Sequence, residues 1–80
     1  MHRYEILAWD NNDELQDSLQ FDKFSDAISH YLYYTCCIES GTMYMVSLYD
    51  NTRPKSNTVL MNFSRYDIMD PETIELYMNL

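Results

Sequence analysis

The stretch GTMYMVSLYD, residues 41–50, constrains the fold of this 80-residue chain more than any other. From Met43 to Tyr49, every residue except Ser47 is apolar. Alternate side chains of a strand point to opposite faces of its sheet, so both faces would be apolar here. The stretch therefore predicts a strand that needs a cover on each side.

A first hairpin is predicted upstream of this strand. Residues 3–9, RYEILAW, are rich in strand formers and lead into DNND, a turn that tolerates left-handed backbone. Residues 14–21 would return as the second strand. The residues of its apolar face would be Leu15, Leu19 and Phe21. Asp17 falls in the same register, which indicates a bulge, a sheet edge or a shorter strand that starts near Ser18.

The principal helix is predicted over residues 23–39. Asp22 is placed to cap its start, and Gly41, the only glycine, is placed to end it in a left-handed conformation. Its apolar face would consist of residues that recur at helical spacing: Phe24, Ala27, Ile28, Tyr31, Leu32 and Thr35.

The second half of the chain predicts another hairpin and a short helix. Residues 42–50 and 58–63 would be its strands, and residues 70–80 open with Asp-Pro, a favourable helix start. The order is ββαββ followed by a helix. We therefore predict an α+β fold, a single domain over residues 1–80 with a four-stranded, mostly antiparallel sheet and the main helix on one face.

The main helix can cover only one face of that sheet. The face it covers would carry Tyr4, Ile6, Leu19, Phe21, Val46 and Leu48. The opposite face would carry an apolar patch made of Leu7, Trp9, Met43, Met45, Tyr49 and Leu60. Burying a large apolar side chain is worth roughly 1.5 to 3 kcal/mol, so a small domain needs this patch covered. Three covers are available: the C-terminal helix, through Ile74, Tyr77 and Met78; a second copy of the chain; or a different protein.

Acidic residues outnumber basic residues by 13 to 5, for a formal net charge of −8. This charge disfavours nucleic acid and anionic membranes as partners and favours a cationic protein surface. One acidic cluster comprises Asp10, Asp13, Glu14, Asp17, Asp22 and Asp26. A second comprises Asp67, Asp70, Glu72 and Glu75. These acids either imitate a phosphate backbone or serve only as turn and cap residues.

No set of residues predicts catalysis or metal binding. Asp26, His30 and Cys37 share a helix stripe, but residues seven apart lie about 10 Å apart along the axis, beyond direct proton transfer. The single glycine excludes a glycine-rich phosphate loop. We therefore expect no enzymatic activity, no cofactor and no bound metal.

The sequence predicts a cytoplasmic protein. No apolar run approaches the ~20 residues needed to cross a bilayer, and the N-terminus lacks the layout of a signal peptide. The adjacent Cys36 and Cys37 lack the spacing of a zinc or redox site, in agreement with a reducing compartment.

The segments YEILAWDNND and LQFDKFSDAI resemble small hairpin-then-helix proteins of phages and mobile elements, in which FDxFxDA opens the helix. The resemblance covers about the first 32 residues and assigns no individual residue a role. Such proteins are often acidic inhibitors of host machinery, including anti-CRISPR proteins and DNA mimics. Small acidic immunity proteins that neutralise nucleases are similar in charge.

These features predict a non-enzymatic, protein-binding inhibitor that occludes a cationic surface of a nucleic-acid-handling protein, such as a CRISPR effector or a nuclease. Tyrosine is enriched at protein interfaces, and at least one of Tyr33 and Tyr34 is expected at the surface. The predicted partner-binding residues are Trp9, Asp10, Asp13, Glu14, Asp17, Tyr33 and Tyr34. The alternative is a self-associating structural or adaptor domain whose apolar patch forms a homodimer.

Overall fold

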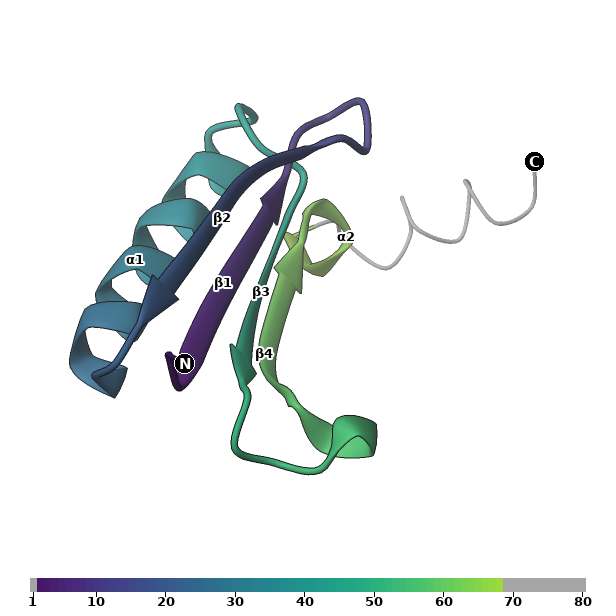
Figure 1. Ribbon diagram of the computed structural model, residues 1–80. Coiled ribbons are helices and arrows are strands. Elements are labelled where there is room, and N and C mark those ends of the chain that lie inside the picture. The colour runs from purple at the N-terminus through teal and green to yellow at the C-terminus, as the bar shows by residue number, and fades with distance from the viewer. Residues whose placement is uncertain (1, 69–80) are drawn as a thin grey trace.

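The computed structural model describes residues 2–68, which form a four-stranded antiparallel sheet with one long helix packed on one face (Figure 1). The strand order is β2-β1-β3-β4. The strands are β1 (Tyr4–Trp9), β2 (Leu15–Phe21), β3 (Met45–Asp50) and β4 (Val59–Ser64). The helices are α1 (Phe24–Glu39), the 3-10 turn η1 (Lys55–Asn57) and the short α2 (Arg65–Ile68). The predicted α+β fold is confirmed, whereas the helix predicted over residues 70–80 lies outside the described residues.

The β1–β2 turn forms through local chemistry, as the sequence predicts. The backbone N–H of Asp10 donates to the carbonyl oxygen of Glu14 at 2.9 Å, and that of Asp13 donates to Asp10 at 3.1 Å. Asp13 has a φ of 63°, the left-handed conformation that Asp and Asn tolerate best.

Strand β2 is a complete edge strand that contains a bulge. Asp17 pairs with Ala8 and Leu15 pairs with Trp9, so Gln16 is the extra residue. Three explanations were predicted for the presence of Asp17 on the apolar face. Two of them, a bulge and a sheet edge, are both correct. The bulge also turns Leu15 to the face opposite α1, so its predicted place on the core face is wrong.

The two ends of α1 differ in how well the sequence predicts them. The N-cap position is Lys23, without a side-chain cap, and Asp22 instead places Oδ1 at 2.8 Å from Nδ1 of His2. The predicted Asp22 cap is therefore wrong. At the other end, Gly41 has a φ of 89° and donates its N–H to the carbonyl oxygen of Ile38 at 3.1 Å, which confirms the predicted helix stop.

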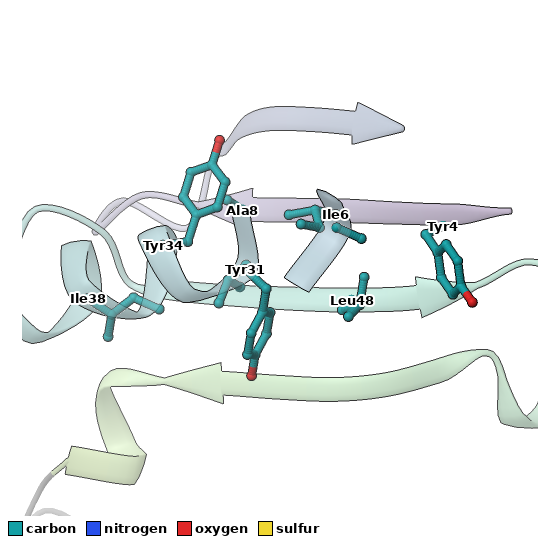
Figure 2. Close-up of a cluster of buried hydrophobic side chains, with 9 residues drawn as sticks. Tyr4, Ile6, Ala8, Tyr31, Tyr34, Ile38 and Leu48 are labelled. Atoms are coloured by element: carbon teal, nitrogen blue, oxygen red, sulfur yellow. The ribbon is translucent and has the colours of Figure 1, made fainter. Parts of the chain in front are cut away.

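The core lies between α1 and the sheet (Figure 2). Its buried members are Tyr4, Ile6, Ala8, Ala27, Tyr31, Tyr34, Ile38, Val46 and Leu48. The apolar face of α1 is rotated from the predicted one, because Tyr34 and Ile38 are buried while Phe24 and Leu32 are 46% and 54% exposed. The hydroxyl of Tyr34 explains part of the rotation, since it donates a hydrogen bond of 2.7 Å to Asp17 on β2.

The turn α2 follows β4 directly and was not predicted from the sequence. The backbone N–H of Ser64 donates to Oδ2 of Asp67 at 2.7 Å, which ties the end of β4 to α2. The backbone N–H of Arg65 donates to the carbonyl oxygen of Tyr44 at 2.9 Å. These bonds hold α2 beside the start of β3.

Candidate interaction surface

The carboxylate of Asp10 organises the β1–β2 turn. Its Oδ1 accepts hydrogen bonds from the backbone N–H of Asn12 at 2.8 Å and of Glu14 at 3.0 Å, and its Oδ2 accepts one from Nε2 of Gln16 at 2.6 Å. The bond from Glu14, followed by those from Asn12 and Gln16, lowers the pKa of Asp10. Asp10 was predicted to bind a partner, and the structure shows that it holds the turn together in its charged form.

Asp13 and Glu14 are exposed at the tip of the same turn. The ion pairs within residues 2–68 lie at the far end of the molecule, on Asp22 and Asp50. In the described part of the chain, no cation neutralises Asp13 or Glu14. Their charge is therefore available to a partner.

The C-terminus of α1 lies at this same end of the molecule (Figure 1). Nδ2 of Asn11 donates to the carbonyl oxygen of Gly41 at 2.9 Å, and Nη2 of Arg65 donates to the same oxygen at 3.0 Å. A helix C-terminus carries partial negative charge, and the last turn of α1 has no basic residue. The carboxylates gathered here, which we call the acidic pole, are Asp10, Asp13, Glu14, Asp17, Glu39 and Asp67.

Charge is distributed unevenly between the two ends of the described structure. At the acidic pole, six acids meet one base, Arg65. The bases of the opposite end are Arg3, Lys23, Arg53 and Lys55. The acids of that end are Glu5, Asp22, Asp26 and Asp50. The protein therefore has a strongly acidic end and a nearly neutral one.

Glu39 is the member of the acidic pole that the sequence did not single out. It joins Asp13 and Glu14 only because α1 returns alongside β1 and ends beside the β1–β2 turn. The sequence feature that could have identified Glu39 is the absence of a basic residue in the last turn of α1, which leaves its charge uncompensated.

The sheet face opposite α1, which we call the second face, is apolar along the central strands. Leu7 pairs with Ser47 and Trp9 pairs with Met45, and the three apolar side chains of these pairs are half-buried. Ser47 is fully buried and accepts a hydrogen bond from Nδ2 of Asn62. The apolar members of the second face are Leu7, Trp9, Leu15, Met45, Tyr49 and Val59.

Two residues predicted for the second face lie elsewhere. Met43 and Leu60 pack against the core on the α1 side. Met43 precedes β3, which begins only at Met45. Leu60 is the extra residue of a bulge, because Tyr49 pairs with Val59 and the next pair along the strands involves Met61. Strand alternation therefore does not apply to either residue.

Tyr33 and Tyr34 differ in solvent exposure. Tyr33 is 63% exposed, whereas Tyr34 is buried at 6% and cannot contact a partner as predicted. Their rings meet edge to face with centroids 5.4 Å apart. Burial and then the hydrogen bond to Asp17 raise the pKa of Tyr34 far above its ordinary value. Asp17 likewise serves the fold, because it satisfies this hydroxyl.

The stripe of Asp26, His30 and Cys37 does not form a reactive set. Nδ1 of His30 donates to the backbone carbonyl oxygen of Asp26 at 3.0 Å, and its ring lies 4.7 Å from that of Phe21. Cys37 lies next to Tyr33 and raises the pKa of that phenol. Within residues 2–68, no three His, Cys, Asp or Glu side chains are grouped so that they would hold a metal ion.

No helix in the described part of the chain combines the length and apolar character needed to cross a membrane. Comparisons with protein-family models, with curated proteins and with solved structures find no match for this chain.

Proposed function

We propose that this protein is a non-enzymatic, acidic inhibitor that binds a cationic surface of a nucleic-acid-handling protein and occludes it. The acidic pole would be its contact surface. CRISPR effectors and nucleases are the proposed targets, because they hold nucleic acid in positively charged channels. Its site of action would be the cytoplasm of a host cell, in keeping with the resemblance of about the first 32 residues to phage and mobile-element proteins.

The separation of charge between the two ends of the molecule is the observation that supports this proposal. Six carboxylates and the C-terminus of α1 add their fields at the acidic pole, against a single guanidinium. Acids that serve only solubility are effective when interspersed with bases over the whole surface. A segregated field steers a cationic partner toward one end.

The residues of the acidic pole would contribute to partner binding in different ways. Asp13 and Glu14, exposed at the tip, would contact the partner directly. Asp10 and Asp17 would add charge while they hold the turn and the helix in place. Trp9, half-buried where β1 enters the turn, would supply the apolar contact beside the charges.

Two matched charge reversals test the proposal. Asp13→Lys with Glu14→Lys reverses the tip of the acidic pole, and Asp22→Lys with Asp26→Lys makes the same change of net charge at the other end. Each protein would be used to purify partners from the native host, followed by measurement of the affinity for the identified partner and of the displacement of its nucleic acid. We expect the first variant to lose roughly tenfold or more in affinity and the second to lose little.

The dependence of the association rate on salt concentration is the second test. Association of the original protein should slow steeply as ionic strength rises, because attraction between exposed charges is screened beyond about 10 Å at 0.1 M salt. The proposal fails if the two double variants bind alike. It also fails if the partner keeps its nucleic acid when this protein is bound.

A further inference from the structure

The two edges of the sheet are protected to different degrees. Each edge strand has one bulge, at Gln16 in β2 and at Leu60 in β4. Strand β2 also turns the carboxylate of Asp17 toward α1, and an inward-facing charge discourages the addition of another strand. The six residues of β4, VLMNFS, contain neither charge nor proline. In the described part of the chain, strand β4 is therefore the edge that is less protected against pairing with another strand.

Apolar side chains remain exposed beside β4. Met61 pairs with Leu48, so it points to the α1 side of the sheet, yet it is 39% exposed. Figure 2 shows the reason: α1 lies over the neighbouring strands, with Tyr34 directed toward β2 and Tyr31 toward β4. Leu32, about 100° further round the helix on the Tyr31 side, is also exposed. Within residues 2–68, the flank between α1 and β4 is thus an exposed apolar strip.

The ends of β4 differ in charge. Arg53 and Lys55 precede its first residue, and Asp67 of the acidic pole follows its last. Arg65, at the same end as Asp67, is directed inward, since Nη2 donates to the carbonyl oxygen of Met43 at 3.1 Å. An antiparallel copy of β4 would place the basic end of each strand beside the acidic end of the other. A parallel copy would place like charges together.

We propose that β4 pairs with β4 of a second copy of this chain, antiparallel, to give one continuous eight-stranded sheet. The twofold axis would stand perpendicular to the sheet, so both α1 helices would lie on the same face. Met61 and Leu32 of both copies would then line a shared strip between the helices. The two acidic poles would lie at opposite ends of the dimer. This dimer uses the sheet edge rather than the second face, and it does not depend on the inhibitory function proposed above.

Lysine substitutions on the two edges test this pairing. Met61→Lys places a charge on the strip at β4, and Leu15→Lys places one on β2 at a side chain that is similarly exposed, at 50%. Sedimentation equilibrium should show a dimer for the original chain and for Leu15→Lys, with circular dichroism confirming that every variant is folded. Met61→Lys should weaken self-association roughly tenfold or more, and Lys55→Glu should weaken it by a smaller factor.

Spin-label distances identify the interface directly. With Cys36→Ser and Cys37→Ser as background, one label is attached at Met61→Cys or at Leu15→Cys. Adjacent strands lie about 5 Å apart, so labels at position 61 should be close neighbours, whereas labels on the two β2 strands should be roughly 30 Å or more apart. A monomer at all concentrations overturns the proposal. So does a dimer that is indifferent to Met61→Lys, or one in which the labels at position 15 are the closer pair.

Discussion

The hydroxyl of Tyr34 donates a hydrogen bond of 2.7 Å to Oδ2 of Asp17 and joins the middle of α1 to the edge strand β2. This contact resolves the conflict that a carboxylate creates on the apolar side of a strand. The partner is a buried phenol whose own hydroxyl needs an acceptor. The pair therefore satisfies two polar groups at once and sets the rotation of the helix.

Removing the hydroxyl should destabilise the fold. For Tyr34→Phe we expect a loss of about 1 to 2 kcal/mol in the free energy of unfolding, because a hydrogen bond to a charged acceptor is lost while the ring stays packed. Urea denaturation would measure the loss. A double-mutant cycle with Asp17→Asn should show coupling between the two positions, and strictly additive effects would contradict the role given to this bond.

Acid should weaken the fold through Asp50. Its carboxylate accepts hydrogen bonds from Oγ1 of Thr52 at 2.6 Å and from Nη2 of Arg3 at 3.2 Å. The bond from Thr52, and next that from Arg3, lower the pKa of Asp50 from 3.8 to about 2. A lowered carboxyl pKa contributes stability that is present above 3.8 and is lost as the pH falls toward 2.

Two variants isolate this contribution. Asp50→Asn should be less stable than the original chain at neutral pH and should lose less stability between about pH 4 and pH 2. Asp26→Asn, an exposed acid on α1, should keep the acid sensitivity of the original chain. Equal pH dependence of the original chain and Asp50→Asn would contradict the assignment.

Two leucines test the orientation of α1 and the position of the core. Leu48→Ala removes a fully buried side chain from β3 and should cost about 2 to 5 kcal/mol, enough to unfold much of a domain this small. Leu32→Ala, at a side chain that is 54% exposed, should change the free energy of unfolding by no more than about 0.5 kcal/mol in the monomer. Thermal denaturation at low protein concentration would compare them, and similar losses would refute the observed helix rotation.

There is room for a side chain at position 41, but the backbone conformation of Gly41 is unfavourable for other residues. A Cβ at this position would have Arg65 as its neighbour at 3.9 Å, ordinary contact, yet the φ of 89° is unfavourable for other residues. Gly41→Ala should therefore cost about 1 kcal/mol, and Gly41→Asn should cost less. Chemical denaturation of both variants gives the comparison, and equal stability of all three proteins would argue against a strained backbone.

The sequence predicted the features that depend on neighbouring residues. The DNND turn, the strand alternation in β1 and the stop at Gly41 all follow from chemistry within a few residues. The face of α1 was missed because its decisive contact, between Tyr34 and Asp17, joins residues 17 positions apart. Helical spacing alone allowed two adjacent faces, and the tertiary partner selected one.

The acidic pole could be predicted only in part. The sequence located the acids of the β1–β2 turn, but the arrival of Glu39 and Asp67 depends on the path of α1 and on the strand order β2-β1-β3-β4. Residue spacing does not determine strand order. Residue spacing also does not reveal that the carboxylates of Asp10 and Asp17 accept hydrogen bonds within the fold, because their partners depend on the turn conformation and on helix packing.

The central position of β1 has a consequence for synthesis of the protein. Strands β1 and β2 leave the ribosome before β3, as a hairpin that alone is at most marginally stable, and the other edge of β1 has no partner until β3 emerges. The interval from Trp9 to Asp50 takes roughly 2 to 8 s at typical translation rates. The nascent chain therefore spends seconds with one edge of β1 unpaired, and during that interval this edge can pair wrongly with another chain.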